Sequence, residues 1–397
     1  MKILVVSKII PRPDFSSGDN RFLGILNLLA SKHEVTFCIP NYQPWLKPEI
    51  CKIYIAHIES LNIKFLPLNV GWFEKVIKTE KFDIGFFEFF WVAEQYMVTF
   101  IKHQKNAVVV VDSVDLHFAR EETQYKLGQI SRNKIWRTKI RELAVYNLAD
   151  ITIAVSDHDR DRILNKKKTG NVLLISNVVP TVSRSKIDRG PSLLFVGCFA
   201  WTPNVDGMLW FVNDIWPLII REKNDAQLFI VGSNPTKEIK NLCSFQGVHV
   251  IGHVYETLPY LNLASISVAP LRYGGGMKGK VNEALAHGLP VVTTSIGAQG
   301  FNAQNGCEMF ISDQPEDFAN AVLKLLNDPV LQYKVGLAGQ KLNEELCSPV
   351  VIEKSLDKLV GVCRDLQDKH ISYKRGIDIW KVKALNFLQG NIWRLFD

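Results

Sequence analysis

Three consecutive glycines mark the most informative loop of the chain. An apolar run ends at Pro270, the glycines follow at 274–276, and a helix is expected to begin near Met277. Glycines let the backbone approach a ligand closely, and the first N–H groups of a helix have no partners within it. The pattern predicts an anion-binding loop at Gly274, Gly275 and Gly276, although a flexible turn would carry the same glycines.

Charged side chains surround this loop. Arg272, Lys278 and Lys280 supply positive charge, which would stabilise a diphosphate leaving group as negative charge grows on its oxygens. Glu283 lies five residues after Lys278 and could accept hydrogen bonds from a ribose attached to the same diphosphate. An ordinary surface carboxylate that complements the helix dipole remains the alternative for Glu283.

A second polar cluster follows the valines at 108–111. Its residues are Asp112, Asp115, His117, Arg120 and Glu121. Ligands usually bind at the carboxyl edge of a parallel sheet, so this cluster is a second candidate site. The alternatives are a loop histidine with satisfied hydrogen bonds and a solvated ion pair between Arg120 and Glu121.

The loop after the first expected strand carries Gly18 and opens a helix. A dinucleotide-dependent dehydrogenase would show G-x-G-x-x-G here, and its absence disfavours an oxidoreductase. Ser17 or Asp19 is expected to cap the helix.

Two strand ends in the second half are candidates for recognition of a nucleotide base. Gly232 and Ser233 follow one strand, and the segment that includes Val254 and Tyr255 follows the next. Backbone amides there could contact the base edge, but ordinary turns at strand ends would have the same composition.

Short apolar runs alternate with amphipathic segments, which is typical of βαβ units with parallel sheets. A stretch rich in proline, serine and charge near 179–192 separates two such series. We expect an α/β protein with two Rossmann-like domains at 1–182 and 190–348, followed by a helix and tail at 349–397. The expected strands are 2–7, 35–39, 63–66, 84–87, 107–111, 151–155, 172–175, 193–196, 227–231, 248–251, 265–269 and 290–293.

The C-terminal end is expected to be helical at 315–326, 330–346 and 350–366. Beyond these helices, apolar residues of 377–396 fall roughly on one helical face with lysines and an arginine beside it. This tail could lie on an anionic inner leaflet or dock on the N-terminal domain, and both alternatives stay open.

Composition places the chain among globular proteins. Its 397 residues are 47% hydrophobic and 22% charged. No N-terminal signal peptide is recognised, and acidic residues interrupt the apolar window 82–101, which is expected to be a strand followed by a helix. Seven scattered cysteines without a C-x-x-C pair favour the reducing cytoplasm. The net charge of +7 favours an anionic partner, but we expect no nucleic acid, because no basic stripe interleaved with aromatics supports such a partner.

Several segments resemble a known family. The segment 270–290, PLRYGGGMKGKVNEALAHGLP, resembles the donor-site signature of family 4 retaining glycosyltransferases with the GT-B fold. Further similar segments occur in the same order as in the branch associated with bacterial surface polysaccharides. They are SSGDNR at 16–21, VDSVDLHFARE at 111–121, ADITIAVSDHD at 149–159, FVGCFAWTPNVDGMLWF at 195–211 and GHVYETLPYL at 252–261.

The resemblance implies two Rossmann-like domains that face a central cleft, and a helix from about Val350 that crosses back toward the first domain. It also implies roles for individual residues. Glu283 matches the second glutamate of a paired motif and would contact the donor ribose, whereas Gly275 stands where the first glutamate is usual. The resemblance also implies that His117 lies against the donor sugar, that Asp115 is a candidate acceptor base, and that Gly18 lines a cleft between the domains. The usual Arg and Lys after the first strand of the second domain are missing from 198–204, so the phosphate clamp would rest on the cations around the glycine loop.

The sequence gives little support for a metal site. The Asp-His-Asp segment at 157–159 mimics the D-x-D metal motif of the other major glycosyltransferase fold, but it follows Ser156 at an expected helix start. Cationic phosphate clamps have no need of a metal ion, so we expect a metal-independent enzyme without a cofactor.

The function that follows is transfer of a sugar from a nucleotide diphosphate donor to a glycan or lipid-linked acceptor, with retention of configuration. A nucleotide-sugar epimerase of the same fold and a non-catalytic sugar-nucleotide-binding subunit are the alternatives. The epimerase would react without an acceptor, and the binding subunit would not turn over with one.

Overall fold

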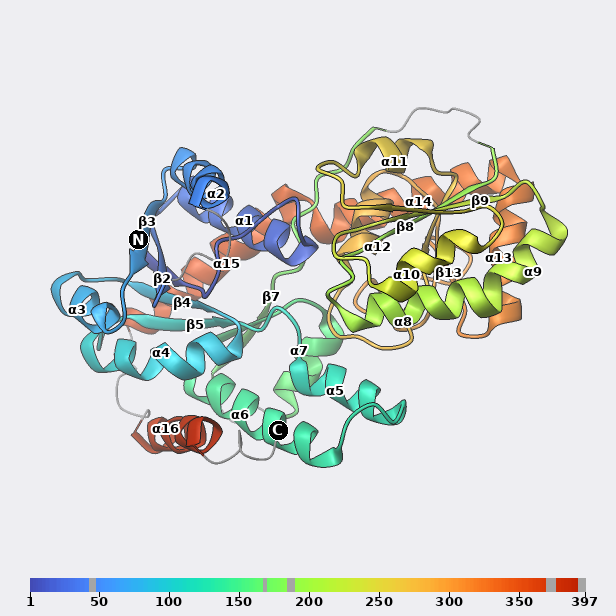
Figure 1. Cartoon of the computed structure of the whole chain (residues 1–397). Coiled ribbons are helices and arrows are strands. Elements are labelled where there is room, and N and C mark those ends of the chain that lie inside the picture. The colour runs from blue at the N-terminus through green and yellow to red at the C-terminus, as the bar shows by residue number, and fades with distance from the viewer. Residues whose placement is uncertain (43–47, 167–169, 184–189, 369–375, 392–397) are drawn as a thin grey trace. The chain divides into compact units, whose positions relative to one another are not determined.

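The computed structural model describes residues 1–42, 48–166, 170–183, 190–368 and 376–391 (Figure 1). The chain packs as two compact units. Unit 1 comprises Met1–Arg12, Phe22–Ile175 and Glu353–Asp397, and unit 2 comprises Pro13–Arg21 and Ser176–Ile352. Each unit is an α/β body with a parallel sheet, as the alternation of apolar runs and amphipathic segments predicts.

The described residues of unit 1 form a sheet of seven strands in the order β3-β2-β1-β4-β5-β6-β7. All pairings are parallel. β4 and β5 read IGFFE and VVVVD and are fully buried, as expected for parallel strands covered on both faces. The strands are β1 Lys2–Val6, β2 Glu34–Pro40, β3 Lys64–Leu68, β4 Ile84–Glu88, β5 Val108–Asp112, β6 Ile151–Ala154 and β7 Asn171–Leu174.

Helices cover both faces of this sheet (Figure 1). The window 82–101 forms β4 and the start of α4, which confirms the prediction of a strand followed by a helix. Within the described ranges, no helix is both long and apolar enough to cross a membrane. The helices are α1 Ser17–Ala30, α2 Pro48–Ser60, α3 Trp72–Thr79, α4 Phe90–His103, α5 His117–Lys126, α6 Arg132–Leu148, α7 Asp157–Leu164, α15 Pro349–Asp368 and α16 Gly376–Asn391.

Unit 2 has a parallel sheet whose described strands number six, in the order β10-β9-β8-β11-β12-β13. Sequence analysis missed β13, which has only two residues. The strands are β8 Ser192–Val196, β9 Gln227–Val231, β10 Val248–Gly252, β11 Ile266–Ala269, β12 Val291–Thr293 and β13 Phe310–Ile311. The helices are α8 Thr202–Trp210, α9 Trp216–Glu222, α10 Lys237–Asn241, α11 Leu258–Leu263, α12 Gly279–Ala286, α13 Pro315–Asn327 and α14 Pro329–Cys347, and a π-helical turn at Phe211–Ile215 joins α8 to α9.

The units divide the chain differently from the expected boundaries at two places. Residues 176–182 pack with unit 2 because Val179 N donates to Cys347 O at 2.8 Å and Val182 N donates to Ala286 O at 2.9 Å. The segment Pro13–Arg21 also packs with unit 2. Part of the expected linker, 184–189, lies outside the described residues.

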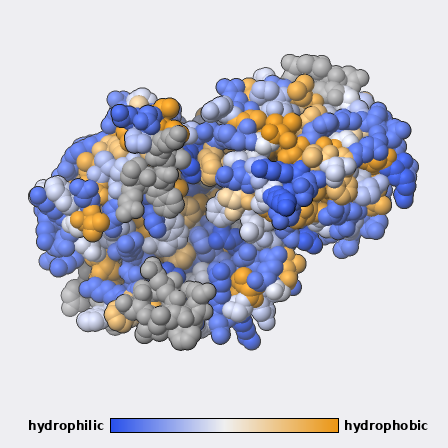
Figure 2. All heavy atoms as spheres, viewed as in Figure 1, coloured by the Kyte–Doolittle hydropathy of each residue, from blue (hydrophilic) through white to orange (hydrophobic). Residues whose placement is uncertain are grey.

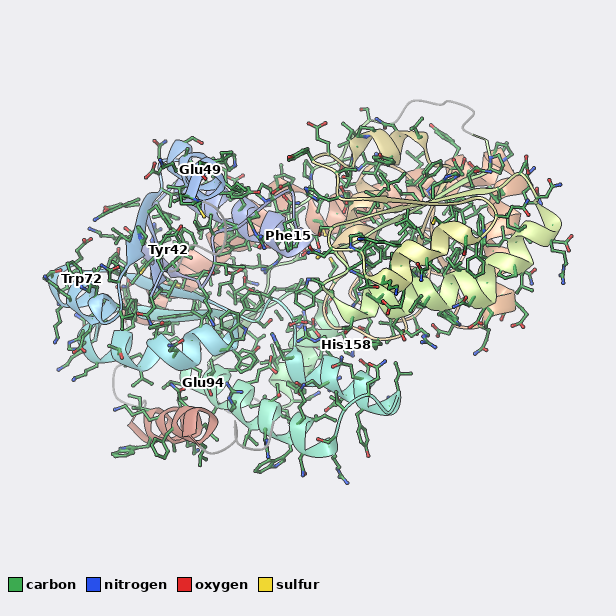
Figure 3. All side chains as sticks on the ribbon, viewed as in Figure 1. Phe15, Tyr42, Glu49, Trp72, Glu94 and His158 are labelled. Carbon is green, nitrogen blue, oxygen red and sulfur yellow. The ribbon has the colours of Figure 1, made fainter. Side chains whose placement is uncertain are left out.

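The C-terminal tail forms α16, which contacts α6 and α4. Val382 is buried in the core of unit 1, and Ile379 packs against the same core. Asn386 Nδ2 donates to the backbone oxygen of Glu94, which is labelled on α4 in Figure 3. One face of the tail therefore docks on the N-terminal domain. Residues 392–397 lie outside the described part of the chain.

Candidate functional site

The candidate anion site of unit 2 begins at the end of the buried strand β11. Leu271 and Tyr273 are buried and hold the ends of the loop to the core, while Gly276 has φ 62°, a left-handed conformation that favours glycine. Lys278 is the N-cap of α12, and its side chain makes no capping hydrogen bond to this helix. Unsatisfied N–H groups and the helix dipole make such a terminus suited to an anion.

The three predicted cations have different surroundings. The Arg272 guanidinium forms two hydrogen bonds to the carboxylate of Asp206, one of them from Nε at 2.9 Å. Lys278 Nζ donates to the carbonyl oxygens of Gly275 at 2.9 Å and Gly276 at 2.5 Å, so it orders the glycine loop. These two cations are therefore already engaged by the protein.

Lys280 has no acidic partner among the described residues. Its Nζ donates to Asn204 Oδ1 and lies 4.5 Å from the centre of the Phe195 ring. Burial, reinforced by the nearby charge of Lys278, lowers the pKa of Lys280 to about 7. A Cβ atom at Gly197 would lie 3.0 Å from this ammonium, so the backbone after β8 passes close to it.

Glu283 is partly buried on α12 rather than an ordinary surface carboxylate. Burial raises the pKa of Glu283, while a hydrogen bond from Thr257 Oγ1 to Oε1 acts in the opposite direction. Thr257 precedes α11 and fixes this carboxylate. Sequence analysis did not identify Thr257, which lies 26 residues from Glu283 in the chain.

The loop that contains Gly18 reaches the start of α12. A Cβ at Gly279 would lie only 2.1 Å from Ser17 Cβ, so a glycine is required where the two backbones meet. Asp19 N donates to Ser16 Oγ at 3.1 Å, so Ser16 caps the beginning of α1 instead of the expected Ser17 or Asp19.

The predicted base-recognition segments also lie at strand ends of unit 2. A Cβ at Gly232 would fall 1.8 Å from the carbonyl oxygen of Gly197, so close backbone packing accounts for this glycine. Within the described chain, the buried Ser233 Oγ has no hydrogen-bond partner. Val254 packs against the core, whereas the Tyr255 side chain is exposed.

The second candidate site lies at the carboxyl ends of β4 and β5, where Glu88 and Asp112 pair. Phe89 follows β4 with φ 67° and Val114 follows β5 with φ 58°. Positive φ is unfavourable for bulky and β-branched residues, and such backbone strain concentrates at functional sites.

The structure brings Asp115, His117 and Arg120 together. Asp115 Oδ1 lies 3.1 Å from His117 Nδ1, and Asp115 Oδ2 accepts a 2.6 Å hydrogen bond from Arg120. The Phe90 ring meets the imidazole edge-on at 5.1 Å. Burial lowers the pKa of His117, which favours the neutral imidazole at pH 7. The alternative ion pair between Arg120 and Glu121 is replaced by the pair with Asp115.

Glu142, on α6, supports this site and was missed by sequence analysis. Its buried carboxylate accepts hydrogen bonds from the backbone N–H of His117 at 3.2 Å, from that of Phe118 at 3.0 Å and from the Tyr146 hydroxyl at 2.7 Å. Burial raises the pKa of Glu142 to about 8, although the three donors lower it. Glu142 thus caps α5 from another helix, which the spacing of 25 residues from His117 does not reveal.

The Asp-His-Asp segment at 157–159 begins α7. Ser156 Oγ accepts from Asp159 N at 3.1 Å and donates to Asp159 Oδ2 at 3.0 Å. His158 is labelled at this helix start in Figure 3. The segment therefore forms a capping arrangement.

Comparison with known proteins places this geometry in context. Residues 190–328 match the family model described as glycosyl transferases group 1. The chain is 26% identical over 365 residues to a Klebsiella pneumoniae protein described as an uncharacterized 44.6 kDa protein in the cps region, covering 81% of this chain and 90% of that protein.

Solved structures share the two-domain architecture. A mutant of S. aureus TarM in complex with fondaparinux, alpha-GlcNAc-glycerol and UDP has a TM-score of 0.70 at 13% identity, covering 91% of this chain and all of that one. Sucrose-phosphate synthase from Thermosynechococcus elongatus has a TM-score of 0.72 at 17% identity, covering 91% and 99%. Anabaena Alr3699/HepE in complex with UDP has a TM-score of 0.66 at 12% identity, covering 91% and 100%. The fold is GT-B, as the resemblance implies.

Proposed function

We propose that this chain, whose residues 190–328 match the family model of the glycosyl transferases group 1, transfers a sugar from a nucleotide diphosphate donor to a glycan or lipid-linked acceptor. The observation that supports this most directly is a buried ammonium, Lys280, without an acidic partner in the described chain, near a helix N-terminus whose N-cap residue, Lys278, makes no side-chain capping hydrogen bond. A buried charge is costly unless it is paired, and a diphosphate supplies the missing negative charge.

Unit 2 is the proposed donor half-site. Lys280 and the amides around Gly274, Gly275 and Gly276 stabilise the departing diphosphate, and Lys278 holds the glycine loop in shape. Glu283, fixed by Thr257, accepts hydrogen bonds from the ribose. Arg272 can join this clamp only by exchanging its hydrogen bonds to Asp206 for bonds to phosphate.

The strand ends of unit 2 supply the proposed base contacts. The amides near Gly232, Val254 and Tyr255 contact the base, and the unpartnered Ser233 hydroxyl is a further candidate. Two structural neighbours are in complex with UDP, which favours a uridine donor for this chain. The cps region of the Klebsiella relative favours a role in surface polysaccharide synthesis.

Unit 1 supplies the proposed catalytic half-site. His117, neutral and with its Nδ1 3.1 Å from Asp115 Oδ1, contacts the transferred sugar. Gly18 contributes from unit 2, in the segment packed on α12. Asp115 acts as acceptor base only if it releases Arg120, so we assign it first to positioning His117. Retention without a metal ion fits front-face attack assisted by the leaving phosphate, because lysines and helix amides already provide the positive charge.

A thermal-shift panel tests the donor site. UDP-, GDP-, ADP- and dTDP-sugars are compared on the wild type, on Glu283→Ala and on Glu316→Ala, an exposed carboxylate of the same unit. One nucleotide sugar is expected to raise the melting temperature of the wild type and of Glu316→Ala but not of Glu283→Ala. Equal responses of all three proteins would contradict the proposed site.

A non-catalytic donor-binding subunit is the second candidate function, because Gly275 stands where the resembling family has a glutamate. Measuring the release of nucleoside diphosphate in the presence of lipid-linked acceptors distinguishes the transferase from the binding subunit. Turnover supports the transferase, and tight donor binding without turnover supports the binding subunit.

A further inference from the structure

A basic stretch on the α5–α6 hairpin is not used by the proposed reaction. Residues 126–141 contain no aspartate or glutamate, and this stretch carries Lys126, Arg132, Lys134, Arg137, Lys139 and Arg141. With Tyr125 and Trp136 beside these cations, this run differs from the expectation that the chain has no basic stripe interleaved with aromatics. The hairpin therefore concentrates positive charge in one place on unit 1.

The cations at the two ends of the stretch 126–141 have different roles. Lys139 pairs with Glu122 at 3.1 Å and Arg141 pairs with Glu94 at 2.6 Å, so these two cations help to hold helices together. Lys126, Arg132 and Lys134, nearer the hairpin loop, are exposed. The charge at this outer end of the hairpin faces solvent.

Exposed apolar side chains accompany these cations. Tyr125 and Leu127 are exposed beside Lys126, and Trp136 is 59% exposed on α6. The core-facing residue of the same turn is its neighbour Ile135, so Trp136 is not needed to fill the core. On the face shown in Figure 2, hydrophilic and hydrophobic residues lie side by side over the outer end of these helices.

The neighbouring helix α16, which packs on α6, repeats this combination. While Ile379 and Val382 pack inward, Trp380 is 76% exposed between them. Lys381 and Lys383 are exposed on the same helix. Two helices of unit 1 that touch each other therefore both present tryptophan and lysine to solvent.

We propose that the outer end of the α5–α6 hairpin, together with α16, binds the surface of an anionic lipid bilayer. Tryptophan and tyrosine have an apolar body and a polar edge that suit the depth of the headgroups, and nearby lysines and arginines are attracted to anionic lipid. A nucleic-acid surface would need base contacts or a groove that tracks a backbone, and neither is evident among the described residues of this hairpin. The proposal does not depend on the transferase activity.

The basic end of α5 lies close to the candidate site that contains His117. α5 has ten residues, so its ends lie about 15 Å apart. His117 begins this helix and Lys126 ends it. A bilayer bound at the Lys126 end would present a membrane-anchored acceptor within a short distance of the candidate site.

Co-flotation of the full chain with vesicles tests the proposal. The vesicles are phosphatidylcholine with or without phosphatidylglycerol. The test variant is Lys126→Glu/Arg132→Glu/Lys134→Glu, and its matched control, Lys237→Glu/Lys240→Glu/Lys334→Glu, makes the same change in net charge at exposed positions of unit 2. Trp136→Ser is paired with Trp72→Ser, another exposed tryptophan of unit 1.

The wild type is expected to float with the anionic vesicles and not with phosphatidylcholine alone. The hairpin variant should bind on the order of a hundredfold more weakly, since each basic residue near the surface adds roughly fivefold. Trp136→Ser should weaken binding more than Trp72→Ser. The substituted side chains are exposed, so unfolding temperatures should match the wild type.

Three outcomes would overturn the proposal. The first is a wild type that does not float with anionic vesicles, and the second is an equal loss of binding in the two triple variants. The third is tighter binding of the same residues to duplex DNA than to the vesicles, which would assign the surface to nucleic acid.

Discussion

Lys280 shows how a single residue connects burial to donor binding. The sequence predicts its charge and its place on the helix after the glycine loop. It does not predict that Arg272 is engaged by Asp206, 66 residues away, because such a pairing depends on which helix lies beside β11. The structure is therefore needed to distinguish Arg272, which has an acidic partner, from Lys280, which has none among the described residues.

Donor affinity is expected to depend on pH through Lys280. Burial lowers its pKa to about 7, and a bound diphosphate favours the charged form. Affinity should be full below pH 7 and should fall by up to about tenfold per pH unit above it. Titration of a UDP-sugar from pH 6 to 9 checks this, with Lys280→Gln as the variant that lacks the titrating group. A wild-type profile that runs parallel to that of Lys280→Gln would rule out this role.

The free energy of unfolding should change with pH in the opposite direction to donor affinity. Between pH 7 and 10.5 the folded chain binds fewer protons at Lys280 than the unfolded chain, so the free energy of unfolding contributed by this group rises with pH. Lys280→Met removes the cost of the buried ammonium and should raise the melting temperature by about 2 °C at pH 7, while donor binding is lost. Thermal unfolding with and without UDP measures both effects. A variant that melts lower but still responds to UDP would contradict the assignment.

At the scale of elements, the strand ends and helix starts were predictable and the contacts between them were not. Apolar runs locate β5 and β11, and glycine and charge locate the loops that follow. Glu142 is different, because nothing in its local sequence indicates that it caps α5 rather than facing solvent on α6. Its role follows from the packing of α6 against α5.

Glu142→Gln tests this helix cap. The amide group cannot accept hydrogen bonds from both backbone N–H groups, so the variant should lose about 1–3 kcal/mol of stability. The folded carboxyl also binds more protons than the unfolded one between pH 4.5 and 8, so wild-type stability should fall with pH relative to the variant. Thermal unfolding across this window measures the difference. Identical pH dependence of the two proteins would show that Glu142 does not titrate as described.

Gly279→Ala tests the contact between α12 and the segment that carries Gly18. The new Cβ would lie 2.1 Å from Ser17 Cβ, so the segment must move, and donor binding should weaken about tenfold or more. Ser17→Gly removes the opposing Cβ and should restore most of the loss in the double variant. A double-mutant cycle on UDP affinity measures this coupling, and fully additive effects would show that the contact does not matter.

At the scale of the whole molecule, the alternation of strands and helices predicted two Rossmann-like bodies correctly. The resemblance also implied a helix from about Val350 that crosses back toward the first domain, and α15 confirms it, because it begins in unit 2 and continues in unit 1. The membership of Pro13–Arg21 was not predicted, because this segment belongs with unit 2 although unit 1 surrounds it in the chain. Such exchanges depend on close contacts such as Ser17 against Gly279, which only the tertiary structure reveals.

The tail shows the same limit. Its amphipathic pattern allowed both docking and membrane binding, and the structure shows that Ile379 and Val382 face the core of unit 1. Trp380, one residue after Ile379, faces solvent. One face of α16 can therefore dock on unit 1 while another face is exposed to solvent. The two alternatives, docking and membrane binding, do not exclude each other.

The most direct test of the central claim is a calorimetric titration of UDP into the wild type, Lys280→Gln and Lys334→Gln at pH 6.5, below the pKa of about 7 at Lys280. Lys334 is an exposed lysine of the same unit and serves as the matched control. We predict that the wild type and Lys334→Gln bind UDP equally and that Lys280→Gln binds at least about tenfold more weakly, as expected for loss of a hydrogen bond to a charged group. Absence of binding to the wild type, or equal binding to all three proteins, would contradict a nucleotide diphosphate site at the start of α12.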